Sequence, residues 1–337
     1  MGVLGFAFLF VGLFHSGHVH AISAVDLTTS PLPISLSAAP GSTVTTDIRI
    51  KNNSPAQSVK VSLMKFSAYG EAGKPALKER EPGDSYFDWV SFSPSIFTAP
   101  TGEWQTVKMT IKIPPKVGFG YYYAVIFTPA NGKPSGKGNI LLGSTAVLVL
   151  LDVQNPNAKR SMQVVTFQAS KHFYEFLPAT LKVKIHNSGN VHLQPHGNIY
   201  ITKGKKQVAS LIVNNQDGSI LPGTNRIYEV DWKDGFPVYA DKQQGGKTVL
   251  DKTGKPINQL TWDWSKFSKL KFGRYTAHLT VVYDNGKQDV PIDASVGFWV
   301  VPVRLILLAI AIPAIPSLAV YYFMKWRMAK RISRGNK

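Results

Sequence analysis

The chain has 337 residues, a formal net charge of +18 and no cysteine. The lack of cysteine excludes disulfide bonds and thiolate metal sites, so each domain must be held together by an apolar core. The basic charge predicts attraction to anionic wall polymers, glycans or lipid headgroups, although lysines that keep exposed strands soluble would give the same charge. We expect no specific nucleic-acid partner.

The first residues have the features of an export signal. Residues 3–14 form an apolar segment too short to span a bilayer, and the cleavage pattern Val19-His20-Ala21 follows it. We therefore predict a signal peptide over residues 1–21, with Ile22-Ser23-Ala24 as a second pattern that would end it after residue 24. No Lys or Arg precedes the apolar segment, which leaves open a start further upstream.

Short alternating segments follow and predict β-strands almost throughout. Apolar and polar residues alternate over residues 44–51, 106–113 and 181–186, so each strand has one buried and one solvated face. Turn residues such as Pro40-Gly41 and Asp284-Asn285-Gly286 lie between such runs. This pattern predicts an all-β chain of antiparallel sandwiches.

An internal repeat divides these strands into two units. Residues 119–124, Phe-Gly-Tyr-Tyr-Tyr-Ala, recur as residues 272–277, Phe-Gly-Arg-Tyr-Thr-Ala. Earlier in each unit, Ile50-Lys51-Asn52 recurs as Ile185-His186-Asn187. Because both signals come in the same order, we predict two immunoglobulin-like antiparallel β-sandwiches.

The predicted domain 1 covers residues 25–154 and domain 2 covers residues 161–298. The break between them is Asn155-Pro156-Asn157, after a long apolar strand. Domain 2 also contains a predicted surface insertion over residues 236–260, which is rich in Gly, Lys, Gln and Asp. Such an insertion either carries recognition or is a disordered loop without a role.

Aromatic residues are the candidate binding residues. Trp262 and Trp264 lie two residues apart, with Phe267 after them, so a strand would place both indoles on one face where sugars or an apolar partner could stack. A core-facing strand has the same spacing. Tyr86 and Trp89 allow the same two interpretations, and on an exposed edge they would favour partner binding by strand addition.

The sequence gives little indication of catalysis. His186, His192 and His196 are close enough in sequence to suggest a weak zinc candidate, but no Cys and no neighbouring carboxylate completes it. No serine or cysteine nucleophile stands in a recognisable motif. We therefore predict a protein that is not an enzyme and has no cofactor or metal.

The C-terminal region predicts a membrane anchor. Residues 305–324 are twenty uncharged, mostly apolar residues, about the length that crosses a bilayer as a helix. We predict a transmembrane helix over residues 303–324, flanked by the anchor residues Arg304, Lys325, Trp326 and Arg327.

The tail gives the predicted orientation. Residues 325–337 carry six positive charges and no acidic residue, which is the pattern of a cytoplasmic end. The two sandwiches would then form an extracellular ectodomain on a cell membrane that the chain crosses once. The missing cysteines fit a bacterial surface protein better than a eukaryotic secreted one.

Short motifs resemble WxL-interacting proteins. Residues 34–42 lead through a Pro-Gly turn into a strand that ends in Ile50-Lys51-Asn52-Asn53-Ser54, as in the first domain of that family. Residues 187–192, 221–223 and 272–275 are similar to the second half of surface proteins built on the same plan. The resemblance implies two sandwiches on a membrane helix, a first domain that binds peptidoglycan and a second that binds a host or matrix protein.

These observations favour a bacterial, membrane-anchored adhesion scaffold at the cell surface without catalytic activity. Its predicted partner is a cell-wall polymer, either peptidoglycan or an anionic glycan, or another surface protein. The alternative is a membrane-tethered chaperone or assembly factor that lends a strand edge to exported surface subunits.

Overall fold

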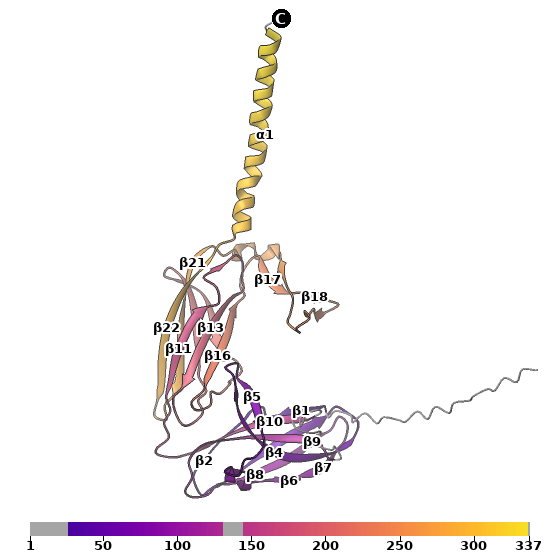
Figure 1. Ribbon diagram of the computed structural model, residues 1–337, viewed down its shortest axis with the longest axis vertical. Helices are drawn as coiled ribbons and strands as arrows, with labels where there is room; N and C mark the ends of the chain where they lie inside the picture. Colours follow the sequence, from indigo (N-terminus) through magenta and orange to yellow (C-terminus); the bar gives the residue numbers. More distant parts are fainter. Residues whose placement is uncertain (1–25, 131–143, 336–337) are drawn as a thin grey trace, which may run out of the picture.

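A computed structural model describes residues 26–130 and 144–335 of the chain. The predicted signal peptide lies outside the described residues. Two β-domains set at a steep angle are followed by one long helix that leaves the far end of the second domain (Figure 1). The predicted fold class, two β-sandwiches followed by a single C-terminal helix, is confirmed.

Domain 1 is a sandwich of two sheets. Its first sheet has the order β1-β3-β8-β6, formed by β1 (Leu27–Ser30), β3 (Thr43–Asn52), β8 (Trp104–Lys112) and β6 (Val90–Ser93). Its second sheet has the order β2-β10-β9-β4-β5, formed by β2 (Ile34–Ala38), β10 (Thr145–Val153), β9 (Phe119–Pro129), β4 (Gln57–Tyr69) and β5 (Lys74–Lys78), with β7 (Ile96–Ala99) also on β4. A short 3-10 helix, η1 (Ser85–Trp89), precedes β6.

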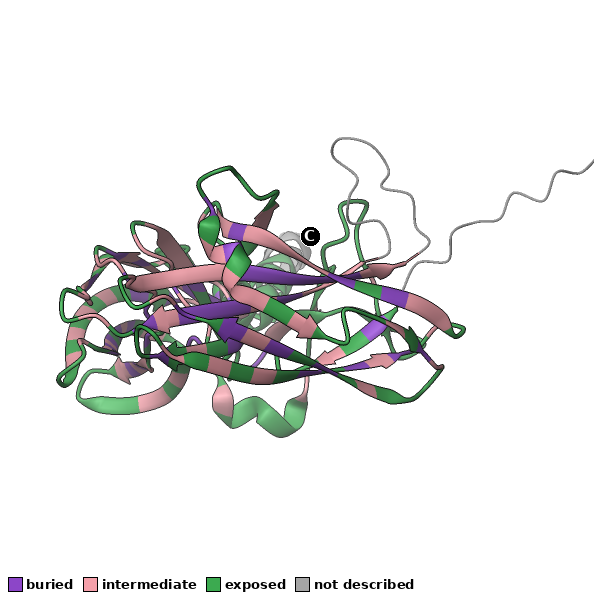
Figure 2. Ribbon diagram, turned by 90° about the horizontal axis from the view of Figure 1, so that it is seen from below, coloured by how far each residue is buried: buried purple, intermediate pink, exposed green. Residues whose placement is uncertain are grey.

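The first segment of domain 1 changes sheets along its length. β1 pairs with β3 in the first sheet, whereas β2 runs parallel to β10 in the second. Pro31 and Pro33 lie at the crossing, and proline has no N–H with which to continue a ladder. The crossing therefore joins the two sheets, between which lies a core that includes Ile48, Val107 and Tyr123. Figure 2 shows buried segments alternating with exposed ones along the strands.

Domain 2 repeats the sandwich plan. One sheet has the order β11-β13-β16, formed by β11 (Met162–Ala169), β13 (Ala179–Asn187) and β16 (Asn225–Trp232). The other has the order β12-β22-β21-β14-β15, formed by β12 (Phe173–Tyr174), β22 (Asp289–Val300), β21 (Gly273–Asp284), β14 (His196–Lys203) and β15 (Lys206–Val213). Their alternating side chains bury Trp232 and Phe298 at the centre.

The repeated Ile-x-Asn signal marks the same structural device in each domain. Asn52 is buried, its amide donates to Pro55 O and Ala99 O at 3.1 and 2.9 Å, and its Oδ1 accepts from Ser54 N at 3.0 Å. Asn187 is also buried, donates to Val191 O and Ile220 O at 2.8 Å each, and accepts from Gly189 N at 2.9 Å. Each asparagine thus ties the end of a central strand to the loops beside it.

The predicted insertion over residues 236–260 forms a small β-arm. β17 (Val238–Asp241) pairs with β20 (Asn258–Thr261), and between them β18 (Gln243–Gln244) pairs with β19 (Lys247–Thr248). The arm projects from the side of domain 2 near the start of the helix (Figure 1). A second 3-10 helix, η2 (Trp264–Lys269), follows it.

The chain ends in α1 (Val303–Gly335), which contains Pro313 and Pro316. The part Val303–Arg327 is long and apolar enough to cross a membrane. The helix continues past Met324, so the basic residues expected in a separate tail begin inside it. Lys and Arg are good helix formers and favour a helix C-terminus, which explains this continuation.

Candidate functional site

The second sheet of domain 1 is apolar on both faces, and its outer face borders domain 2. Phe66, Ala124, Ile126 and Leu150 are buried on this outer face. Partly buried apolar side chains pack around them: Met64, Leu77, Tyr122, Ala146 and Leu148, with Leu221 of domain 2. A sandwich sheet normally turns polar residues outward, so this second apolar layer indicates a surface that covers, or is covered by, another chain segment.

The hairpin formed by β4 and β5 connects this face to domain 2. β4 pairs with β9 only up to Lys65, and beyond it β4 pairs with β5 alone among the described strands. The hairpin turn reaches β16, where Ile227 N donates to Glu71 O at 2.7 Å. The Glu71 carboxylate also binds Lys184 Nζ at 2.6 Å and accepts from Asn225 Nδ2 at 3.0 Å.

These bonds favour the ionised form of Glu71. The Lys184 ammonium and then the Asn225 amide lower the pKa of this carboxyl. Arg226 packs between the two domains, donates to Ser219 O at 2.9 Å and leaves no space for a Cβ at Gly73 or Gly218. The hairpin and Arg226 thus join domain 1 to domain 2 in the structure.

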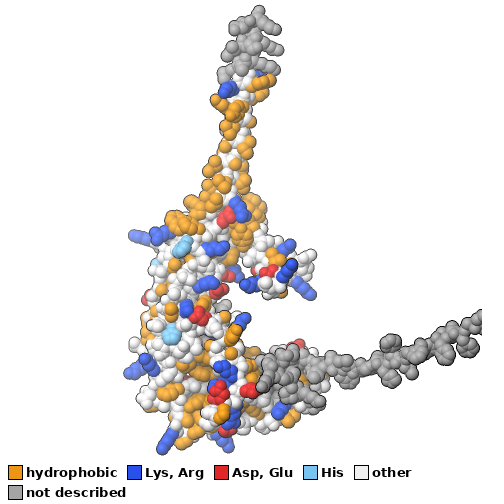
Figure 3. Space-filling view, viewed as in Figure 1, with side chains coloured by type: hydrophobic (Ala, Val, Ile, Leu, Met, Phe, Trp, Pro, Cys, Tyr) orange, Lys and Arg blue, Asp and Glu red, His pale blue; other side chains and the backbone are white. Residues whose placement is uncertain are grey.

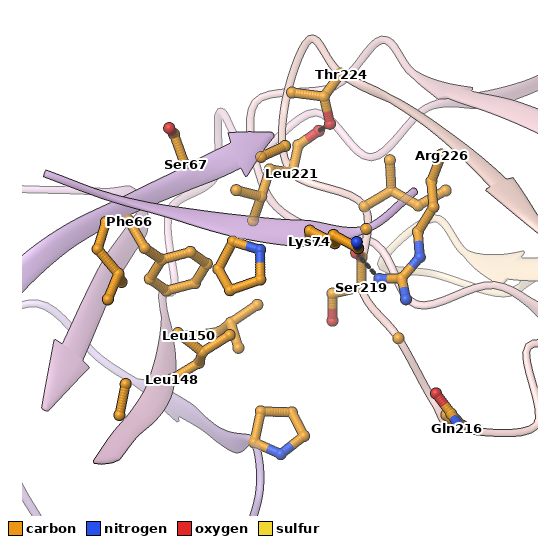
Figure 4. A pocket seen from close by; sticks show the side chains of 18 of the residues that line it. Phe66, Ser67, Lys74, Leu148, Leu150, Gln216, Ser219, Leu221, Thr224 and Arg226 are labelled. Atoms are coloured by element: carbon orange, nitrogen blue, oxygen red, sulfur yellow. Dashed lines mark hydrogen bonds between the residues drawn. The ribbon is translucent and has the colours of Figure 1, made fainter. Parts of the chain in front are cut away.

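A cavity of about 520 Å³ lies between the hairpin, β10 and the loop before β16. Phe66, Leu148 and Leu150 face it from domain 1, and Leu221 and Arg226 face it from domain 2 (Figure 4). Its wall is mostly apolar, with Lys74 and Arg226 as the basic lining residues. Such a cavity fits apolar side chains better than a polar metabolite.

The strand beside this cavity has an open edge. β10 pairs with β9 along its whole length, but β2 pairs only with Val149–Val153. Among the described residues, Thr145–Leu148 therefore have a strand on one side only. Pro33 ends the ladder here because it has no N–H to donate.

The open edge and the cavity form one site. Ala146 and Leu148 belong to the open part of β10 and line the cavity, while Val147 points into the core of domain 1. Leu32 completes the lining from the segment before β2 and is 57% exposed. An extended peptide that paired with this edge would place every second side chain at the apolar face.

A second contact fixes the domains at the linker. Arg160 forms an ion pair with Asp152 at the end of β10, and the rings of Tyr122 and His192 meet edge to face at 5.8 Å. Burial lowers the pKa of His192, and the Asp152 carboxylate opposes this shift in part. The described contact thus favours the neutral imidazole.

Two of the predicted binding residues have packing roles. Tyr86 and Trp89 lie in η1 and pack against the core of domain 1. The Tyr86 ring contacts the rings of Tyr121 and Tyr123, and the Tyr123 hydroxyl donates a hydrogen bond to the Tyr86 backbone carbonyl oxygen at 3.1 Å. Burial raises the pKa of Tyr86 to about 12. Neither ring lines the cleft, the name we give to the cavity together with the open edge of β10.

The other three predicted binding residues are exposed. Trp262, Trp264 and Phe267 are 41, 68 and 58% exposed and surround Phe236. Trp264 begins η2 instead of continuing a strand, because Asp263 caps the turn by accepting from Ser265 N. The two indoles nevertheless stack, with ring centroids 5.7 Å apart.

The three histidines occupy different surroundings. His186 Nδ1 lies 2.9 Å from Asn225 Oδ1, His192 lies at the domain contact, and His196 is exposed at the start of β14. Within residues 26–130 and 144–335, no group of three His, Cys, Asp or Glu side chains is arranged to hold a metal ion.

The predicted anchor residues lie at the two ends of the candidate span. Arg304 forms an ion pair with Glu175 at 3.3 Å, and its backbone N–H donates to the same carboxylate at 3.1 Å. Lys325, Trp326 and Arg327 lie at the other end, where the Arg327 guanidinium packs over the Phe323 ring. A hydrophobic span with basic residues at each end suits a membrane.

No protein-family model and no curated protein matches this chain. Solved structures do match it. The class 5 fimbriae chaperone CfaA is 15% identical, with 80% of this chain and 98% of that chain covered and a TM-score of 0.35. The Pseudomonas aeruginosa CupB2 chaperone is 8% identical, with 79% of this chain and 98% of that chain covered and a TM-score of 0.34. A chain from the complex of Salmonella enterica SafA pilin with the SafB chaperone is 9% identical, with 82% of this chain and 99% of that chain covered and a TM-score of 0.33.

These matches correct the main functional prediction. The prediction of an adhesion scaffold that binds cell-wall polymer is contradicted, since the similar structures named above are a fimbriae chaperone, a second chaperone and a complex of a pilin with its chaperone. The likeness concerns the type of fold, so the function of this chain rests on its own cleft and strand edge. One pattern in the sequence could have indicated that site: residues 145–151 are apolar almost without alternation, as in a strand buried on both faces.

Proposed function

We propose that this protein is a membrane-anchored chaperone or assembly factor that binds an extended segment of an exported protein by strand addition. The segment would pair with Thr145–Leu148 of β10 and place alternate apolar side chains in the neighbouring cavity. The observation that carries the proposal is this open strand edge beside an apolar cavity of about 520 Å³. No catalytic step is part of the proposed activity.

The physical reason is that the edge and the cavity satisfy different parts of one ligand. Unpaired N–H and C=O groups of an edge strand bind the backbone of any extended chain, whatever its sequence. The apolar lining then selects segments with large apolar residues at every second position. Subunits that have not yet assembled expose such segments.

The anchor and its orientation are also part of the proposal. α1 would hold the two domains at a membrane, with the basic end at Lys325 and Arg327 in the cytoplasm and both sandwiches outside it. The Glu71 and Arg226 contacts would keep the cavity and the open edge in one shape, so that binding would not require the domains to order first. Membership of the WxL-interacting proteins, suggested by the short motifs, stays a proposal as well.

A peptide titration tests this function. The full chain in detergent would be titrated into a fluorescent peptide of alternating Val and Thr, with anisotropy as the readout. Leu148→Lys should weaken binding about tenfold or more, because an ammonium buried without a partner loses its hydration. Ile212→Lys is the matched control, since Ile212 is 66% exposed on β15 of domain 2.

Thermal unfolding of both variants would show whether the chain still folds. Leu148→Ala removes apolar contact without adding a charge, and we expect a smaller loss of affinity from it than from Leu148→Lys. Equal affinity of the native chain, Leu148→Lys and Ile212→Lys would contradict the proposed site.

A further inference from the structure

An exposed, mostly aromatic collar lies at the end of domain 2 from which α1 continues. We define the collar as the six residues Phe173, Trp264, Phe267, Leu270, Phe272 and Trp299, which are 65, 68, 58, 37, 53 and 42% exposed. Soluble surfaces carry single exposed apolar side chains, but six large ones at one end of a domain indicate a partner. Figure 3 shows hydrophobic side chains gathered around the foot of the helix.

Three separate segments place the collar at the same end of the domain. Phe173 of β12 pairs with Trp299 of β22, and their rings stack at 6.4 Å. Phe272 precedes Gly273, which pairs with Val300 at the end of β22. η2 is joined to this end through Leu270, which forms a bridge with Phe236.

The start of α1 fixes where this end of the domain must lie. Only Val301 and Pro302 separate β22 from α1. Arg304 is tied to Glu175 by an ion pair and a backbone bond, so the first turn of the helix is attached to the domain. A membrane entered by α1 would therefore lie directly against the collar.

The residue types suit the interface of a bilayer. Residues 264–272 read Trp-Ser-Lys-Phe-Ser-Lys-Leu-Lys-Phe, so lysines alternate with large apolar side chains. Tryptophan and other amphipathic rings favour the headgroup level, while lysines reach the phosphates. Lys266 and Lys269 are held in place by ion pairs with Asp263 and Asp234.

We propose that the collar inserts into the headgroup region of the same bilayer that α1 spans, and so holds domain 2 against the membrane surface. This inference rests on the membrane anchor of the proposed function. Its ligand is the phospholipid interface itself, bound chiefly by the aromatic rings. The cleft of domain 1 would then be held at a constant distance from the bilayer.

The absence of cysteine allows a direct test with single labels on the full chain. Ser268→Cys places a bimane label in η2 without removing a collar residue, Ser210→Cys places it on β15 as the matched control, and Ser317→Cys places it in α1. Each labelled protein would be reconstituted in nanodiscs of phosphatidylcholine and phosphatidylglycerol that contain nitroxide-labelled lipid, with headgroup or acyl-chain nitroxides.

We expect headgroup nitroxides to quench the label at position 268 about two- to threefold more than the label at position 210, because the neighbouring rings lie at that depth. Acyl-chain nitroxides should quench the label at position 317. Adding Trp264→Ser and Phe267→Ser to the Ser268→Cys chain should reduce its quenching to the level at position 210. Both side chains are largely exposed, so this double variant should still fold.

Three other results would each contradict the proposal that the collar inserts into the bilayer. Quenching at position 317 with equal quenching at positions 268 and 210 would reject the collar and leave the anchor intact. No quenching at position 317 would reject the anchor and the collar together. Unchanged quenching at position 268 in the double variant would show that the aromatic residues do not hold this surface at the bilayer.

Discussion

The buried Asn52 gives a prediction whose size follows from the structure. Asn52→Ala removes two donated bonds, to Pro55 O and Ala99 O, and one accepted bond from Ser54 N. The bond to Ala99 O is buried and the other two are partly buried. At about 1 kcal/mol of net stability for each bond, the change should destabilise domain 1 by about 3 kcal/mol.

Hydrogen–deuterium exchange on the full chain can measure this loss within one domain. A loss of about 3 kcal/mol corresponds to about a hundredfold faster exchange of the protected amides in β3 and β8. Asn53→Ala is the matched control, because Asn53 is the next residue, is exposed, and should change exchange little. Equal exchange in the two variants would refute the claim that the buried amide holds the strand end.

Two further predictions concern the contacts between the domains. The pKa of His192 is lowered in the folded state, so the unfolded chain binds more protons as pH falls below about 6.5, and the free energy of unfolding should decrease there. Urea titrations at pH 7.5 and 5.5 should show a smaller decrease for His192→Gln than for the native chain. His196→Gln, the control, should show the same decrease as the native chain. Glu71 has a lowered pKa, so its contribution is present above its unfolded pKa and is lost as pH falls through the folded value. Glu71→Gln should broaden the spin-label distances between domains at neutral pH by removing the ion pair with Lys184, and unchanged distances would contradict the clamp.

The sandwiches and the helix were predictable because they depend on local patterns. Alternation over residues 106–113 produces β8, and the uncharged residues 305–324 lie inside α1. The repeated Ile-x-Asn signal was also informative, since Asn52 and Asn187 make the same three-bond contact in both domains. Local periodicity determines the strands and the helix without knowledge of distant contacts, whereas the bonds of the two asparagines also reach residues far along the chain.

The cleft was not predictable, because it depends on segments far apart in the sequence. Phe66, Leu148 and Leu221 come from two domains and meet where the β4–β5 hairpin extends beyond β9 toward domain 2. The strand predicted for Trp264 was replaced by η2, because the Asp263 side chain caps a turn there and a period-two pattern contains no information on capping.

Cysteine crosslinking at the open edge tests the central claim most directly. An Ala146→Cys chain would be mixed with short peptides of alternating Val and Thr, each with one Cys moved through successive positions, and disulfide formation would be measured at each position. Strand addition at β10 predicts crosslinks at every second peptide position, because only alternate residues face the side chain at position 146. Equal crosslinking at all positions, or the same yield with Ile212→Cys as with Ala146→Cys, would contradict binding of an extended segment at this edge.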